Sequence, residues 1–484
     1  MIARADRANP LRWYLAALLL GLVLSLLEGY PLLKFQAQRL AEIVPALGLL
    51  AWCYRRQPAA FFSEPVLSGW YGLGLVGFAA AALLSGAVGA IPWISLGFLG
   101  LVLLQFGLLP LLQPVWQRHG ADLVRLLALF TVAVLGMDVG IWLLARAFEV
   151  TPYAWVLRPE PGGGMAEAPY LYLNSRWANQ LTVLLIWTFV PLLQQLQQRV
   201  IVRQRRFWWA ICGAVPLLGL SQIVLNQGDG ALLAVVVGGA GLALAGWRSA
   251  AESRRLCWTA TGLLLGAGLL AALLSAALNA GDFFTEFAQR GAEQLAPAAP
   301  TAQKRIVLWP AYARAVLASP WLGAGIPAIA PASPECTPHN LWLALLHWTG
   351  LLGTAAALAL ATAFVPRHWS GRGVSVMALP LLLSLFVYQL VDDIWLRPLA
   401  LALLLVLLPG LKLLDAAQPS PQLFAQQKAP QRWLQRFAFP AATYRLLAVV
   451  GVLLITISSV VPGGVGFAPS ELVSMPKSLC VLFF

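Results

Sequence analysis

The chain has 484 residues, of which 60% are hydrophobic and only 11% charged, and its mean hydropathy is +0.77. Soluble domains carry about 45 to 50% apolar and about 25% charged residues, so a soluble core cannot bury this much apolar surface. The formal net charge of +13 does not indicate nucleic acid binding either, because the basic residues lie in short segments between apolar runs.

Apolar runs long enough to cross the roughly 30 Å hydrocarbon core of a bilayer recur along the whole chain. We therefore expect an all-α polytopic membrane protein, with a single integral domain over residues 1–484 and about 12 to 13 transmembrane helices. The first run continues into Glu28 and Pro31 without a cleavage pattern, which predicts an uncleaved anchor. The expected spans are centred near Leu20, Leu47, Gly77, Leu103, Val134, Leu185, Leu217, Val236, Leu269, Leu352, Leu383, Leu404 and Ile455.

The basic residues between the spans predict the orientation of the chain. With the N-terminus inside, alternate connections place about two thirds of the 32 Lys and Arg residues on the inner face, as the positive-inside rule requires. The inside segments include residues 199–206, and residues 415–445 form a linker before the last span that is rich in Gln, Pro, Ala and Lys. An odd number of spans then puts the C-terminal tail outside.

Two connections on the outer face are longer than the others. The smaller covers residues 148–174 and the larger covers residues 281–338. Apolar residues in the larger loop recur at helical spacing at Ile306, Trp309, Ala313 and Val316. This spacing predicts an amphipathic helix on the outer membrane surface, in a loop whose length is typical of functional segments.

The histidines are the first candidates for chemistry, and the chain has four. His119 and His368 fall in inside connections beside basic residues, where a solvated surface position is expected. His339 lies where the large loop re-enters the membrane, and His347 lies about two turns deeper. A neutral imidazole at this interface can take a proton from a hydroxyl group. The structural alternative for His339 is helix capping or interface anchoring.

The basic residues expected on the outer face form a second group. A guanidinium group presents a fixed fork of donors that suits phosphate oxygens, so several arginines on one face would suit a diphosphate leaving group. Binding of lipid headgroups is the alternative interpretation. The arginines concerned are Arg176, Arg290, Arg305 and Arg314.

Acidic residues are sparse in the apolar part of the chain. Asp392 and Asp393 lie in an outside connection between two spans, and Asp229 lies in another outside turn. Asp138 is the one carboxylate expected well inside a span, where it has either a functional role or a polar backbone partner.

The remaining residue types suggest no other chemistry. The five cysteines are scattered, so neither a metal site nor a disulfide framework is expected. Cys336 and Cys480 alone share the outer face, either as a disulfide bridge or as unrelated thiols. No glycine-rich phosphate loop, zinc-ligand cluster or serine nucleophile elbow occurs in the sequence.

One segment resembles a known family. Pro338-His339-Asn340, followed by Leu343, Gly350 and Gly353, resembles the His-Asn, Leu and Gly-x-x-Gly signature of the O-antigen ligase and polymerase superfamily. The segments before it, Arg305 to Trp309 and Ser319 to Gly325, are similar to that family's approach to the same helix.

The resemblance extends over roughly residues 170–410. Upstream, Asn174 to Gln180 and Pro191 to Leu193 resemble the entry segment in one branch of the family, and downstream Asp392, Asp393 and Pro398 resemble its next extracellular turn. Two positions depart from the family pattern. Trp348 stands where many relatives carry an acidic residue, and Gln227 to Gly230 replaces a Ser-Arg-Gly turn.

The resemblance implies a membrane glycosyltransferase of the bacterial inner membrane whose active site faces the periplasm. The implied reaction is a metal-independent, inverting transfer of a glycan from undecaprenyl diphosphate to an acceptor hydroxyl, and it needs no cofactor. It implies that the 281–338 loop is catalytic, that His339 is the base or acceptor orienter, and that the four arginines bind the diphosphate. The supporting residues are Asn340, Trp309, Asn179, Asp392 and Asp393.

The acceptor is the open part of this expectation. We favour lipid A-core, which makes the protein a ligase of lipopolysaccharide biosynthesis. An O-antigen polymerase and a protein (pilin) O-oligosaccharyltransferase are the alternatives within the family. A lipid-glycan transporter or flippase is the alternative from another class, and it predicts ionisable relays deep in several spans or inverted repeats. The expected partners are the lipid-linked donor, the acceptor and membrane lipids, without nucleic acid.

Overall fold

The structure is a computed structural model, and every regular element in its described residues is helical. The described residues are 9–26, 31–56, 69–89, 92–147, 175–198, 204–226, 228–248, 251–278, 300–326, 328–330, 333, 338–363, 378–392, 399–416 and 441–460. The first seven helical elements are α1 (Pro10–Leu26), α2 (Pro31–Arg56), α3 (Gly69–Val88), α4 (Pro92–Ala147), α5 (Ser175–Leu185), η3 (Ile186–Thr188) and α6 (Phe189–Gln197). The others are α7 (Arg205–Leu225), α8 (Asp229–Arg248), α9 (Ala251–Leu278), α11 (Pro300–Ala318), α12 (Leu341–Thr362), α13 (Ala378–Gln389), α14 (Ala400–Ala416) and α17 (Ala441–Val460).

The helices are those of a multi-pass membrane protein. Seven helical segments in the described ranges are long and apolar enough to cross a bilayer, and three shorter apolar helices accompany them. The expected all-helical membrane class is therefore confirmed, whereas the span number of about 12 to 13 stays a prediction. The loop at 148–174 and most of the linker at 415–445 lie outside the described residues.

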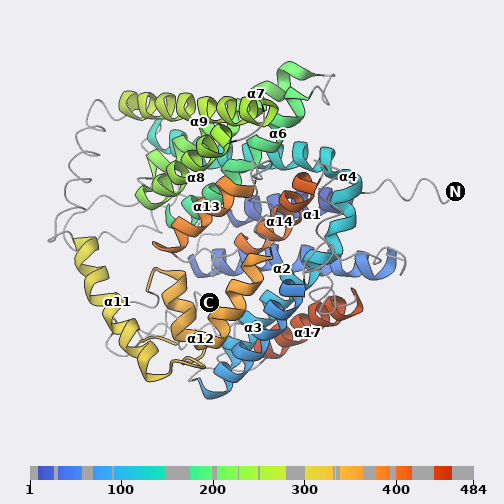
Figure 1. Cartoon of the computed structure of the whole chain (residues 1–484), viewed down its shortest axis with the longest axis vertical. Coiled ribbons are helices and arrows are strands. Elements are labelled where there is room, and N and C mark those ends of the chain that lie inside the picture. Colours follow the sequence, from blue (N-terminus) through green and yellow to red (C-terminus); the bar gives the residue numbers. More distant parts are fainter. Residues whose placement is uncertain are drawn as a thin grey trace.

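Helix α4 corrects one expected boundary. The sequence predicts two spans, centred near Leu103 and Val134, with an inside connection at Arg118. Both spans are found as separate apolar segments, Ser95–Leu112 and Arg118–Leu144, but α4 is one helix of 56 residues that continues through Arg118, and it bends along the edge of the molecule in Figure 1. Hydropathy reports preference for water or lipid and not backbone conformation, and Gln and Arg are good helix formers in either setting.

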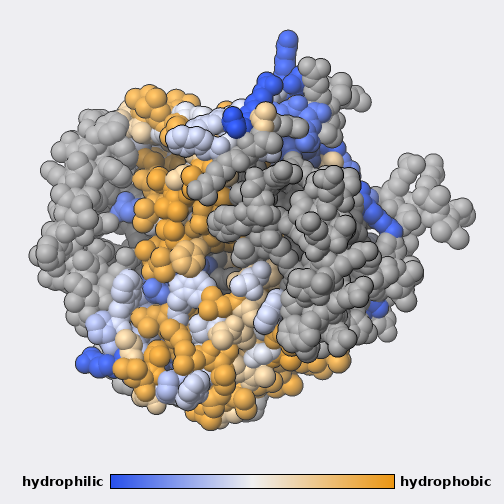
Figure 2. All heavy atoms as spheres, in the orientation of Figure 1, coloured by the Kyte–Doolittle hydropathy of each residue, from blue (hydrophilic) through white to orange (hydrophobic). Residues whose placement is uncertain are grey.

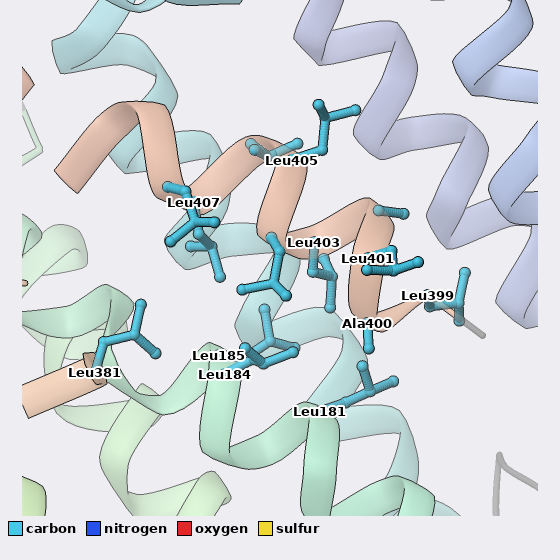
Figure 3. Close-up of a cluster of buried hydrophobic side chains, with 14 of the residues drawn as sticks. Leu181, Leu184, Leu185, Leu381, Leu399, Ala400, Leu401, Leu403, Leu405 and Leu407 are labelled. Carbon is cyan, nitrogen blue, oxygen red and sulfur yellow. The ribbon is translucent and has the colours of Figure 1, made fainter. Parts of the chain in front are cut away.

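Close pairs of helices form the frame of the bundle. Helix α3 packs along α12, α4 along α17, and α8 along α13. At the contact of α4 and α17, a Cβ atom on Gly100 would lie 2.6 Å from the Gly451 carbonyl oxygen. Glycine at this contact lets two backbones approach closely, which strengthens packing where the hydrophobic effect does not drive helices together. Leucines of α5, α13 and α14 fill the interior between these pairs (Figure 3).

The interior also contains an ion pair that the sequence analysis missed. Glu42 on α2 is fully buried, and its carboxylate accepts a 2.8 Å hydrogen bond from the Arg39 guanidinium group, which is 6% exposed. The backbone of Leu399 and Ala402, at the start of α14, also hydrogen bonds to this carboxylate. Glu42 is therefore a deeply buried carboxylate besides Asp138, which is 3% exposed. A buried charge is costly unless it is paired, and Arg39 supplies the opposite charge.

The surface separates apolar and polar residues. Arg205 and Arg206 are exposed at the beginning of α7, and hydrophilic atoms gather over that part of the molecule in Figure 2, whereas apolar atoms cover the middle of the same face. Leucines on α9 such as Leu265 and Leu269 are 69% and 65% exposed. Exposed leucines at this density are typical of a surface that contacts lipid acyl chains.

Candidate functional site

Asn340 is the N-cap residue of α12. This residue has extended backbone angles (φ −153°, ψ 111°), and its side-chain oxygen accepts a 3.0 Å hydrogen bond from the backbone N–H of Leu343. Asparagine is among the best N-cap residues because it satisfies one of the first free N–H groups of a helix. The alternative in which His339 caps the helix is therefore wrong, since Asn340 holds that position.

His339 is held in an unusual conformation next to the cap. Its φ angle is +48°, in the left-handed region that costs a non-glycine residue about 1 to 3 kcal/mol. The side chain is 16% exposed, and its Nδ1 atom lies 3.6 Å from Oδ1 of Asp392, whose side chain is 7% exposed. Strain of this kind is concentrated at functional sites.

Residues at the end of α13 support this pair. The Tyr388 hydroxyl donates to Oδ2 of Asp392 over 3.5 Å, and the Asn340 amide donates a 3.1 Å hydrogen bond to the Leu390 carbonyl oxygen. His339 and Asn340 begin one helix, whereas Tyr388 and Asp392 end another, so the two helix ends are tied together at two points. The predicted supporting residues Asn340 and Asp392 therefore lie beside His339.

Helix α11 is hydrogen bonded to the residue that precedes His339. The indole N–H of Trp309 donates a 2.9 Å hydrogen bond to the carbonyl oxygen of Pro338, the residue before His339. Leu308 and Tyr312 are buried against α12, and the Tyr312 ring meets the His347 ring edge to face at 5.1 Å. Trp309 thus connects the large loop to the residue next to the candidate base.

The structure confirms a helix in the 281–338 loop and shows which of its sides packs on the protein. The sequence predicts an apolar stripe through Trp309 and Ala313 that lies on the membrane surface. Trp309 is 36% exposed, and the residues packed on the protein are instead Leu308, Ala311 and Tyr312. Figure 1 shows α11 at the edge of the molecule beside α12. The stripe is left free to face lipid, because the opposite side of the helix is taken by α12.

Helix α12 is broken in its middle. Gly350 has φ +63° and ψ −167°, angles that are essentially restricted to glycine. A break inside a membrane span frees backbone groups that lipid cannot satisfy, so protein groups must replace the lost hydrogen bonds. The expected span centred near Leu352 is therefore two half-helices in one element.

The segment that follows α11 fills this break. The N–H groups of Ala324 and Gly325 donate to the carbonyl oxygens of His347 and Trp348 at 2.7 and 3.0 Å. In the other direction, the N–H groups of Leu351 and Leu352 donate to the carbonyl oxygens of Pro320 and Trp321 at 2.8 and 3.3 Å. The Ser85 hydroxyl of α3 adds a hydrogen bond to the Trp348 carbonyl oxygen. Two parts of the family-like pattern, Pro320 to Gly325 and Gly350, thus form one hydrogen-bonded unit.

Glycine is required at the crossing of these two segments. A Cβ atom on Gly350 would lie 2.2 Å from the Trp321 carbonyl oxygen, and one on Gly323 (φ +71°) would lie 2.5 Å from the Trp348 carbonyl carbon. Real Cβ atoms do not approach backbone so closely. The Trp348 indole donates a 2.9 Å hydrogen bond to the Ala328 carbonyl oxygen and so joins the same unit.

Helices α5 and α8 complete the surroundings of the His339 pair. A Cβ atom on Gly228, in the turn between α7 and α8, would lie 2.4 Å from the Asn179 amide nitrogen of α5. One on Gly230 would lie 2.9 Å from Val391 and 4.0 Å from the Tyr388 ring. Asn179, the α7–α8 turn and the end of α13 are therefore in contact, and Tyr388 links them to Asp392.

The structure tests the predicted arginines only in part. Arg290 and Asp393 lie outside the described residues, as do Cys336 and Cys480. Arg176 and Arg305 are placed only as positions on α5 and α11. Arg305 precedes Trp309 by four residues, so the two share a face of α11, whereas Arg314 is exposed and follows Trp309 by five residues on another face. Arg314 is therefore not brought to His339 by the packing of α11.

Sequence reasoning missed two contributors to the site. Tyr388 precedes Asp392 by four residues on one helix face, a spacing that could have identified it. The burial of His347, which is 2% exposed, had no signal in the sequence.

The site consists of a histidine and carboxylate pair at the meeting of five helices, with neutral amides around it. Among the described residues, no group of three or more His, Cys, Asp or Glu side chains is placed to hold a metal ion. No known protein-family model matches the chain, and no curated protein is significantly similar to it in sequence.

Proposed function

We propose that the protein is an O-antigen ligase-like glycosyltransferase, which transfers a glycan from undecaprenyl diphosphate to a hydroxyl group of lipid A-core at the periplasmic face of the inner membrane. The observation that carries the proposal is the placement of His339. It is strained, part-exposed and paired with Asp392 at the entry of α12, in the segment that resembles the family signature.

The pair suits the removal of one proton from an acceptor hydroxyl. When Nδ1 carries a hydrogen directed at Asp392, Nε2 has the lone pair that accepts the hydroxyl proton. The carboxylate then stabilises the positive imidazolium ring that forms. The acceptor oxygen attacks the anomeric carbon, the bond to the diphosphate breaks, and the diphosphate leaves with the electron pair. Such proton transfer contributes typically about 10² to 10⁴-fold in rate.

The leaving diphosphate requires cationic groups. Arg305 is the best candidate on α11, because it shares a helix face with Trp309, whose indole is bonded next to His339. Arg176 lies in the first turn of α5, three residues before Asn179, and so shares a helix face with it. Arg290 is retained from the sequence alone, and Arg314 is the weakest of the four candidates on geometry. Bidentate guanidinium groups at these positions would stabilise the charge that develops on the phosphates.

A transporter of lipid-linked glycans is the second candidate, and two observations favour it. Broken helices line the binding sites of many transporters, and α12 is broken at Gly350. The Arg39 and Glu42 pair is an ionisable group deep in the bundle. However, the backbone groups at the break are bonded to the segment 320–325, so they are not open to a substrate.

The test is a reconstitution of the purified full chain in vesicles with a polyprenyl diphosphate-linked oligosaccharide. Lipid A-core, a second copy of the lipid-linked glycan and pilin are each offered as acceptor, and products are separated by mass. Formation of glycosylated lipid A-core is the expected result. A longer lipid-linked glycan would instead indicate a polymerase, glycosylated pilin a protein transferase, and movement of the donor across the bilayer without any product a transporter.

A further inference from the structure

Five buried amide side chains stand on helices whose ends meet near the His339 pair. They are 0 to 8% exposed, and each has at least one amide nitrogen or oxygen without a hydrogen-bond partner among the described residues. For Gln180 and Gln222 both amide atoms lack a partner. We call them the amide cluster, and its members are Asn179, Gln180, Gln222, Asn226 and Gln389.

Contacts between helix ends bring the members to one end of the bundle. Asn179 abuts Gly228, two residues after Asn226, which is the C-cap residue of α7. Gln222 precedes Asn226 by four residues and so lies on the same face of α7. One turn deeper on α7, Gly219 contacts Thr182 of α5.

The end of α13 contributes the last member of the cluster. Gln389 directly follows Tyr388, and Tyr388 contacts both Gly230 and Asp392. The ends of α5, α7, α8 and α13 therefore meet beside Asp392, and the five amides stand on or next to three of these helix ends.

Leaving these amides unsatisfied has a cost. A buried polar group without a partner destabilises a protein, and such groups are rare enough that each needs an explanation. Other unpartnered amides occur singly, as at Gln105, whereas this end of the bundle holds five. A ligand that supplies both donors and acceptors would remove the cost.

The chemistry of the cluster selects the kind of ligand. Amides carry donors and acceptors together and no charge, so they match hydroxyl and acetamido groups rather than phosphate, which needs cations. Sugar hydroxyls also donate and accept at once. The neutral cluster and the arginines expected on the outer face would thus serve different parts of one substrate.

We propose that the amide cluster is a sugar-binding subsite, which hydrogen bonds the hydroxyl and acetamido groups of the sugar that reacts beside His339. This inference rests on the proposed function, because that function supplies a sugar at this place. The sugar belongs either to the donor, next to the diphosphate, or to the acceptor, and the two sources are separated by experiment.

The first variant is Gln222→Leu, which removes both unpartnered atoms and nearly keeps the side-chain volume. Because an apolar group replaces an unsatisfied amide, the variant is expected to melt at the same or a higher temperature in detergent than the wild type. Its binding of sugar should nevertheless fall. A gain in stability together with a loss of binding distinguishes a ligand site from an amide that merely supports the packing.

Binding is measured with two synthetic probes, a polyprenyl diphosphate that carries one N-acetylhexosamine and the same lipid without sugar. If the sugar is the donor's, wild type binds the first probe at least about tenfold more tightly than the second, and Gln222→Leu binds both equally. If it is the acceptor's, the KM for lipid A-core rises at least about tenfold in the variant and the donor probes bind as in wild type. By contrast, Arg305→Lys should weaken both donor probes together.

Gln105→Leu is the matched control. Gln105 is also buried with both amide atoms unpartnered, but it lies on α4 between Leu104, which contacts Gly451, and Phe106, which accepts a hydrogen bond from Tyr71. It should gain stability without any change in binding or transfer. Unchanged donor binding and unchanged KM in Gln222→Leu, with wild-type transfer intact, would overturn the subsite alone. No transfer and no donor binding by wild type would overturn the proposed function and the subsite together.

Discussion

Two regions around α12 differ in whether their buried polar groups have hydrogen-bond partners within the protein. At the Gly350 break, the freed carbonyl and N–H groups of four residues are all bonded to the segment 320–325, and Ser85 adds one more hydrogen bond. At the beginning of α12, a histidine with left-handed backbone angles has its Nδ1 atom 3.6 Å from a carboxylate oxygen of Asp392, and five buried amides have atoms without a partner among the described residues. The hydrogen bonds at the break are completed by the protein itself, whereas we propose that a ligand completes those of the amides. Mutations at the Gly350 break should therefore lower stability, whereas mutations at the beginning of α12 should lower activity.

The largest effect is expected at Gly350→Ala. A methyl group would lie 2.2 Å from the Trp321 carbonyl oxygen and would force alanine into angles open only to glycine. Backbone strain and overpacking together should cost at least about 3 kcal/mol and expel the segment 320–325 from the break. The measurement is the yield of monodisperse protein and its melting temperature in detergent.

Gly262→Ala on α9 is the control for this change, since nothing lies within 4 Å of a Cβ atom there. It should match wild type or gain up to about 1 kcal/mol from helix propensity. A normal melting temperature for Gly350→Ala would mean that the break is not the rigid unit we describe.

His339→Ala should remove transfer while leaving the amount of folded protein nearly unchanged. The lost base contributes about 10² to 10⁴-fold in rate, and Asn340 still caps the helix. Transfer to lipid A-core and abundance in membranes are measured on the same samples.

His339→Asn sharpens the result, because asparagine tolerates the left-handed angles of this position but is no base at neutral pH. It should be as abundant as wild type and inactive. Substantial transfer by the Asn variant would show that residue 339 acts through backbone conformation and not through proton transfer.

Asp392→Asn should have a smaller effect on activity. The amide keeps the shape of the carboxylate and its contact with Tyr388, but it cannot stabilise a positive imidazolium ring. We expect kcat to fall about 10 to 100-fold, as when the carboxylate partner of a functional imidazole is removed, with little change in KM. Steady-state kinetics would refute the pairing if kcat were unchanged, or if only KM rose.

The smallest effect is expected for Asn340→Ala, at the N-cap of α12 directly after His339. The change removes the cap of α12 and the hydrogen bond to Leu390, so it should cost about 1 kcal/mol of stability, as N-cap removal typically does. Thermal melts of Asn340→Ala and Asn340→Ser provide the check, because serine can restore the cap but not the second bond. Equal melting temperatures for both variants and wild type would contradict the capping geometry.

What the sequence by itself determined follows from local chemistry. Composition and apolar run lengths predict the helical membrane class, because the cost of exposing backbone to lipid depends on each segment alone. The pattern around His339 and Asn340 predicts the start of α12, because capping involves residues only three positions apart. Even this local reasoning placed a connection inside α4, since hydropathy does not report whether a helix continues.

Only the tertiary structure decided which distant residues complete one another. It paired His339 with Asp392, inserted the segment 320–325 into the gap at Gly350, and satisfied Glu42 with Arg39 and the start of α14. It also left the amide cluster without partners, a state that no single segment reveals. Whether a buried polar group is satisfied depends on every helix packed against it, and those helices come from segments that can be hundreds of residues apart.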